Sequence, residues 1–214
     1  MIALCAWLAI AGLAFQPDIG VVRRVFEDAL ARREREFGPT DTRTAQAARD
    51  LGLFLRANGD AAGARRALAQ AVHIDEGGLG ASASQTLEDA FSLATVSPPA
   101  AAEPLLRRAG ESPDPVVAGQ ALSTLAGLRK SAGDLAGAAT FFRRALAKAE
   151  QADGPDGETA ELILNLLLPL DRQTLGPRHP QTLQDARRLV DLYRKTGRSR
   201  EAAALEQQIN AGPH

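Results

Sequence analysis

The chain has 214 residues, 45% of them hydrophobic, and is long enough to bury a continuous core as one domain or a short repeat array. Aromatic residues make up only 4%. The abundance of Ala, Leu and Arg favours closely packed helices over a β-sheet. The formal net charge of -1 argues against the basic surface that nucleic-acid binding requires.

Residues 1–15, MIALCAWLAIAGLAF, are uncharged and almost wholly apolar. This length matches the core of a secretory signal peptide and is short for a membrane span, and Gly12 and Ala14 supply small residues for cleavage. No Lys or Arg precedes the apolar run, so an uncleaved anchor, a first packing helix and a misassigned start stay open. The only cysteine, Cys5, lies here, which excludes an internal disulfide. We expect an exported, periplasmic or membrane-tethered bacterial protein, with a cytoplasmic location as the alternative.

Glycines recur along the chain at a fixed spacing. The pattern GxxxxxT occurs three times, at 38–44, 80–86 and 176–182, with a shorter relative at 154–159. A second set of turns lies at Gly59, Gly133 and Gly197, where glycine can end a helix in the left-handed conformation. Glycines of the two sets alternate 21 residues apart, which predicts helical hairpins of about 42 residues. Thr44, Thr86 and Thr182 are expected to start the first helix of a hairpin or to cap it nearby.

In chain order, the pattern predicts a lone helix at 18–36 that packs on the next helix, followed by hairpins at about 40–75, 82–110 and 114–152, a single helix at 157–174 and a hairpin at 179–210. In the second hairpin, Ser97-Pro98-Pro99 replaces the glycine turn and shortens the second helix to about 103–109. The single helix opens like the first helix of a hairpin and closes like the second, as a deletion of about 20 residues would produce. Pro169 within it predicts a kink or break, and a change in direction of the array.

The order Leu-Gly, Gly-Asp, Ala and Ala-Leu in these hairpins resembles the tetratricopeptide repeat (TPR). The period of about 42 residues with Gly-Pro loops resembles its kinesin-light-chain-like subclass. The segments FEDALARREREFGPTDTRTAQAARDLGLFLRANGD and FFRRALAKAEQADGP carry the resemblance best, and it covers residues 18–210. It implies an all-α, right-handed superhelical array of antiparallel hairpins, with about nine to ten helices, over residues 16–214.

No motif for catalysis, metal binding or cofactor binding is found. His73, His179 and His214 have no carboxylate or cysteine at ligand spacing, so no metal site is predicted. His179 matches the loop histidine of the repeat subclass, which implies that it stabilises the turn. No phosphate-binding glycine loop follows a strand, and no serine belongs to a recognisable triad motif. We therefore expect no catalytic residue and no cofactor.

In this repeat family the first helix of each hairpin lines a concave groove, and counting back from the glycine turn assigns the positions that face it. These are Gln46, Arg49, Leu53 and Arg56 in the first hairpin, Gln120, Ser123, Gly127 and Lys130 in the third, and Gln184, Arg187, Asp191 and Arg194 in the last. Gln amides bind peptide backbones and cations bind carboxylates, so the groove would suit an extended peptide with acidic groups or a C-terminal carboxylate. Alternatively, an Arg-rich and Gln-rich solvent face shows these residues anyway, with cations complementing helix dipoles. Glu88 and Phe91 interrupt the row in the second hairpin.

The sequence thus predicts a non-enzymatic scaffold that binds a protein or peptide, acidic groups being favoured. No nucleic-acid partner is expected. A contact with a membrane is expected only through residues 1–15, if these are not cleaved from the mature protein. A structural subunit or assembly factor of a bacterial envelope complex is the alternative. An enzyme on a helical solenoid is a third hypothesis, because scattered residues can build a site that no motif reveals.

Overall fold

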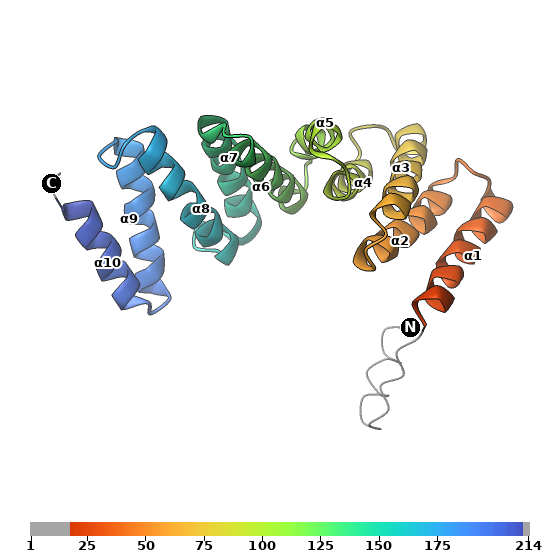
Figure 1. Ribbon diagram of the computed structural model, residues 1–214, viewed down its shortest axis with the longest axis horizontal. Helices are drawn as coiled ribbons and strands as arrows, with labels where there is room; N and C mark the ends of the chain where they lie inside the picture. Colours follow the sequence, from red (N-terminus) through yellow and green to blue (C-terminus); the bar gives the residue numbers. More distant parts are fainter. Residues whose placement is uncertain (1–17, 212–214) are drawn as a thin grey trace, which may run out of the picture. The chain divides into compact units, whose positions relative to one another are not determined.

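A computed structural model describes residues 18–211, and within them every regular element is an α-helix (Figure 1). The predicted array of helical hairpins is confirmed for this part of the chain. The apolar segment 1–15 and His214 lie outside the described residues. Within 18–211 no helix is both long enough and apolar enough to cross a membrane. The helices are α1 (Ile19–Phe37), α2 (Thr42–Ala57), α3 (Ala61–Gly78), α4 (Ser84–Thr95), α5 (Pro99–Ala109), α6 (Pro115–Ser131), α7 (Leu135–Asp153), α8 (Glu158–Thr174), α9 (Pro180–Lys195) and α10 (Ser199–Asn210).

The described chain divides into two compact units, residues 18–74 and 75–211. The first unit holds α1, α2 and most of α3, and the second holds the last turn of α3 and the helices α4 to α10. In the first unit, α1 is the lone helix expected before the first hairpin. It packs on α2, with the rings of Phe26 and Phe54 stacked at 4.9 Å between centroids.

The turns lie where the glycine spacing predicts them. Seven glycines of the described chain have a positive φ, from 76° to 97°, and they are the seven of the two predicted sets. A side chain in this region would clash with the backbone. Gly38 and Gly154 have ψ of 163° and 170°, a combination that essentially only glycine adopts. The 21-residue spacing of glycines in the sequence therefore corresponds to a regular spacing of turns with positive φ.

The threonine of each GxxxxxT loop is a buried third residue of its helix, so it neither starts nor caps the helix as expected. Thr44 and Thr86 donate their hydroxyl hydrogens to the carbonyl oxygens of Gly38 and Gly80, at 2.8 and 2.9 Å, and so close the loop. The capping residue of α9 is instead His179, whose Nδ1 accepts from the Gln181 N–H at 3.2 Å. This is the turn-stabilising role that the repeat resemblance implies for the histidine.

The three threonines are not equivalent, which allows a matched test. Thr86→Val is expected to lower the free energy of unfolding by about 1 kcal/mol, because it removes the hydrogen bond from a fully buried hydroxyl and leaves the Gly80 carbonyl only the longer bond from the Ala83 N–H, at 3.2 Å. The Thr182 hydroxyl is buried and has no hydrogen-bond partner in residues 18–211. Thr182→Val is therefore expected to be neutral or stabilising. Urea denaturation of both variants checks this, and equal losses would contradict the loop-closing role of the hydroxyl.

The second hairpin differs from its prediction in the length of its second helix. Instead of about 103–109, α5 begins at Pro99, directly after the Ser97-Pro98 turn. Proline suits the first position of a helix, because its fixed φ is already helical and its missing N–H would have no partner there. At 11 residues, α5 is still the shortest helix of the described chain.

The helix that contains Pro169 is not broken. α8 continues for 17 residues to Thr174, although proline removes one backbone hydrogen bond from its interior. Its seven buried residues, from Ala160 to Asp171, each lie 22 positions before a buried residue of α9. The buried positions of α8 therefore match those of α9, the first helix of its hairpin. Its C-terminal end matches that of α3, the second helix of a hairpin, because the N–H groups of Leu175 and Gly176 donate to the Asp171 carbonyl oxygen as those of Leu79 and Gly80 donate to that of Asp75.

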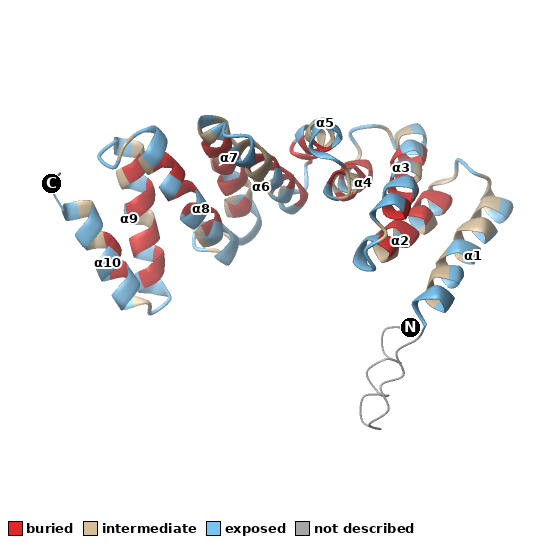
Figure 2. Cartoon of the chain, in the orientation of Figure 1, coloured by how far each residue is buried: buried red, intermediate tan, exposed pale blue. Residues whose placement is uncertain are grey.

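Two layers of helices follow from this in the second unit. Successive helices run antiparallel, so α7 lies beside α9 and α8 beside α10. Arg188 of α9 forms an ion pair with Glu150 of α7, and Arg198, which precedes α10, forms one with Glu161 of α8. α6, α8 and α10 thus make one layer and α7 and α9 the other. The main buried core has residues of all five helices, and buried residues are red in Figure 2. A hairpin without its second helix shifts every later helix to the opposite layer.

Candidate functional site

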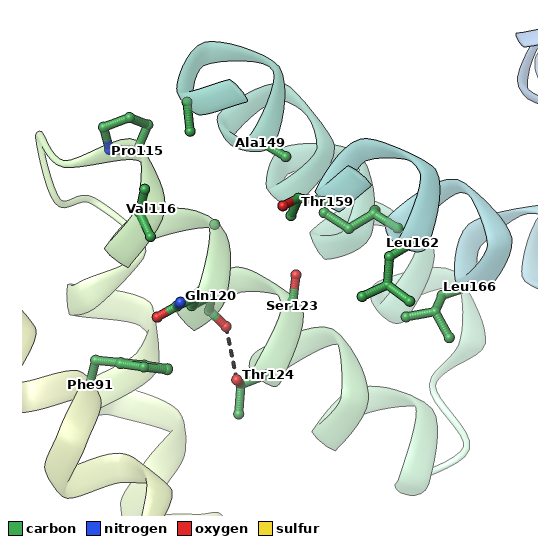
Figure 3. Close-up of a pocket in the computed structure, with 13 residues that line it drawn as sticks. Phe91, Pro115, Val116, Gln120, Ser123, Thr124, Ala149, Thr159, Leu162 and Leu166 are labelled. Carbon is green, nitrogen blue, oxygen red and sulfur yellow. Dashed lines mark hydrogen bonds between the residues drawn. The ribbon is translucent and has the colours of Figure 1, made fainter. Parts of the chain in front are cut away.

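An apolar groove opens in the second unit between α6 and α8, with the C-terminal part of α7 contributing Ala149 and Ala152 (Figure 3). It has a volume of about 360 Å³. Leu162 and Leu166 project from α8 toward α6. The other side carries Phe91 of α4, Val116, Gln120 and Ser123 of α6.

The groove exposes large apolar side chains. Val116 is 51% exposed, Leu162 61% and Leu166 38%, in a described chain that exposes only eight large hydrophobic side chains in all. Leaving such side chains in water forfeits roughly 25 cal/mol per Å² of apolar surface that burial would recover. Clustering of exposed apolar groups in a concave surface is typical of a binding site.

The groove has few polar side chains, and most of them are free to form hydrogen bonds with a ligand. The side-chain amide of Gln120 and the hydroxyls of Ser123 and Thr159 have no hydrogen-bond partner within residues 18–211. Thr124 is already used, because its hydroxyl donates to the Gln120 carbonyl oxygen at 2.8 Å. The groove can therefore offer about three side-chain hydrogen bonds to a ligand.

A cation follows the groove on α6, where Lys130 lies near the C-terminal end of the helix. Arg172 has the same place on α8, one 42-residue period later, but it lines the hollows that α8 shares with α9 and α10 and does not line the apolar groove. The described part of the chain provides neither side chain with an ion pair or hydrogen bond. The α6 side of the groove is thus followed by a cation without an ion pair in the described residues.

Counting back from a glycine turn did not find the apolar half of this groove. The method counts back from the short glycine turn that ends the first helix of a hairpin, and α8 ends instead in a Gly-Pro loop. Advancing one period from Gln120 and Thr124 of α6 leads to Leu162 and Leu166. This 42-residue step would have revealed the leucines from the sequence.

The positions predicted on α9 do not join those on α6. Gln120 and Lys130 belong to the layer of α6 and α8, whereas Gln184, Arg187 and Arg194 lie on α9, beside α7. The assignment of these positions assumed that the first helix of every hairpin lies in the same layer. Because no second helix follows α8, α9 lies in the opposite layer from α6. Arg194 also pairs with Glu206 and Asp191.

In the first unit, the predicted positions follow one side of α2. Gln46 and Arg56 are exposed, while Arg49 and Leu53 are half-buried. Arg49 and Arg56 both interact with other groups of the chain. The binding role assigned to these four residues stays a prediction.

The residues described contain no cluster of three or more His, Cys, Asp or Glu side chains suited to a metal ion. A different polar cluster is buried among α7, α8 and α9. Arg143 forms an ion pair with the fully buried Asp171, and Asp185 is only 5% exposed. Burial, followed by the neighbouring Asp171, raises the pKa of Asp185 to about 6.

The same loop arrangement occurs twice in the second unit. Asp75, Leu79, Gly80, Thr86 and Asp89 have the spacing of Asp171, Leu175, Gly176, Thr182 and Asp185, and all four aspartates are buried. The acidic pairs accompany the loops and lie apart from the apolar groove. We assign them to the structure of the array.

Comparison with solved structures identifies the same fold in proteins of distant sequence. The chain is similar to BtubC (BKLC) from P. vanneervenii, with a TM-score of 0.57 and 15% identity over 94% of this chain and 95% of that one. It is also similar to TPR-like repeats from Podosopora anserina described as a kinesin light chain, with a TM-score of 0.51 and 18% identity over 89% of this chain and 85% of that one. The chain matches no protein-family model and no curated protein in sequence. The likeness shows a TPR-like fold.

Proposed function

We propose that this chain is a protein-interaction scaffold that binds its partner through the apolar groove between α6 and α8. The exposure of Val116, Leu162 and Leu166 in one concave surface carries the proposal. A TPR-like fold supports it, because such arrays present concave faces to other proteins. The groove is well placed for this role, since its walls are helices held by a buried core and need no rearrangement to receive a ligand.

The double variant Leu162→Gln with Leu166→Gln is expected to weaken partner binding at least about tenfold, equivalent to about 1.4 kcal/mol. Glutamine is similar in length and a good helix former, so the change removes apolar contact without charge or loss of helix. The partner is first captured by a photo-crosslinking residue placed at position 120 in cells, then purified for titration calorimetry.

Leu175→Gln is the matched control. Leu175 is 42% exposed in the same unit, but it lies in the loop after α8 and outside the groove. This variant is expected to bind like the unaltered chain. If all three leucine positions matter equally, or none does, the groove is not the binding surface.

The location of the protein is a separate part of the proposal. We propose that the chain acts outside the cytoplasm, on the strength of the uncharged apolar run at residues 1–15. Fractionation of cells that express the full chain, with mass spectrometry of its N-terminus, tests this. Recovery in the cytoplasm with residues 1–15 intact would disprove export.

A further inference from the structure

We infer that the partner presents an amphipathic α-helix whose apolar side chains enter the groove and whose acidic end lies over Lys130. This rests on the proposed function and adds the form and charge of the partner. From the sequence, an extended peptide is expected. A helix fits better, because the groove has few polar groups and because its apolar and charged residues have a suitable spacing.

The polar groups of the groove favour a helix. Along α6, the site from Val116 to Lys130 extends for 14 residues, or roughly 21 Å. An extended peptide of that length has about six residues, each with a backbone donor and acceptor to satisfy. Besides the Lys130 ammonium at the end of the site, only the side chains of Gln120, Ser123 and Thr159 are available for this purpose. A helix satisfies its own backbone, so it can cover an apolar surface without losing hydrogen bonds.

The spacing of apolar and charged groups defines the partner further. Gln120 lies ten residues before Lys130 on α6, roughly 15 Å along the helix axis. A complementary helix has apolar residues on one side over two turns. Asp or Glu follows on the same side, two to three turns after the first apolar residue. Since Lys130 has no acidic partner in the described chain, an acidic partner residue would not compete with an existing ion pair.

A designed peptide provides a direct test on the full chain. The probe is a fluorescent Ala- and Gln-based peptide of about 16 residues with Leu at its positions 1, 4 and 8 and Glu at 11 and 15, which share one helix face. Fluorescence anisotropy is expected to show saturable binding. Leu162→Gln with Leu166→Gln should weaken it at least about tenfold, and a central proline in the peptide should do the same by breaking the helix.

Charge exchange tests the orientation. Lys130→Glu should weaken binding of the acidic peptide at least about fivefold, and a peptide with Lys in place of Glu should restore it. Leu175→Gln is again the control and should leave the affinity unchanged. Restoration by the matched charge change is an outcome that a general loss of folding cannot produce.

The other outcomes separate this inference from the proposed function. If the proline peptide binds as well as the helical one while the leucine variant binds neither, the groove is a binding site but its ligand is extended, and the helix inference is wrong. If binding survives the leucine variant, both ideas are wrong. If no peptide binds at concentrations up to about 1 mM, the helix inference is overturned.

Discussion

Gly52→Val is expected to lower the free energy of unfolding of the first unit by about 3 kcal/mol, the upper part of the usual range for overpacking. Gly52 lies on α2 where that helix crosses α3. A Cβ atom at this position would lie 2.6 Å from Leu68 Cγ and 3.2 Å from the Leu68 backbone nitrogen. Leu68 is fully buried, so it cannot turn away into solvent. The close approach of two helices here therefore requires glycine.

The same substitution at Gly127 is the matched control. Gly127 is also within a helix, α6, but a Cβ there would meet nothing within 4 Å. Gly127→Val is expected to change stability by less than about 0.5 kcal/mol, since valine and glycine differ little in helix propensity. Urea denaturation followed by circular dichroism at the helix band measures both. Similar losses at the two positions would show that helix propensity, rather than packing, determines the effect.

Asp185→Asn is expected to raise the free energy of unfolding at pH 7 by up to about 3 kcal/mol. The folded chain raises the pKa of Asp185 from its ordinary 3.8 to about 6, first because the carboxyl is buried and second because Asp171 lies next to it. The Oδ2 atoms of both aspartates have no hydrogen-bond partner in the described residues. A proton on Asp185, or the amide of Asn, would supply the missing donor to Asp171.

The sign of the pH dependence follows from the raised pKa. The folded state holds a proton on Asp185 that the unfolded state has released, so the stability contributed by protonation is complete below about pH 4 and is lost as the pH rises through about 6. The unaltered chain should therefore lose stability between pH 4 and 7, whereas Asp185→Asn should have a flatter profile. Thermal or urea denaturation at intervals across this range measures the difference. An unchanged slope would show that the proton is held elsewhere in the cluster.

Asp41 provides a comparison of opposite sign. Hydrogen bonds from the side chain and backbone of Arg43 lower the pKa of Asp41 to about 2. Its ionised form contributes stability above the ordinary pKa of 3.8, and this is lost as the pH falls toward 2. Asp41→Asn should thus reduce stability at neutral pH, with the difference disappearing in acid.

The helices and turns of this protein follow closely from its sequence. All seven glycines of the two spacing sets have a positive φ, because no other residue adopts that conformation without strain. The lone first helix, the absence of a glycine turn near Ser97 and the single helix before Gly176 are likewise visible in the printed residues. These features are local, so local residue types are sufficient to predict them.

The apolar groove was only half predicted. Gln120, which the sequence singled out, lines the groove, but its neighbours Leu162 and Leu166 were missed because α8 has no glycine turn from which to count. Within α8, an alternation of buried and exposed leucines looks like an ordinary core helix. Which leucines remain exposed depends on the helices that pack beside it.

The sequence by itself determined the repeat period, the turn positions and the helical content, since each depends on residues that are near one another in the chain. Only the tertiary structure decided which layer each helix occupies. The absence of one helix after α8 exchanges the layers for α9 and α10, and Arg187 and Arg194 move away from Lys130 without any change in their own local sequence. Side-chain periodicity defines the faces of a helix, but the number of helices before it determines where those faces point.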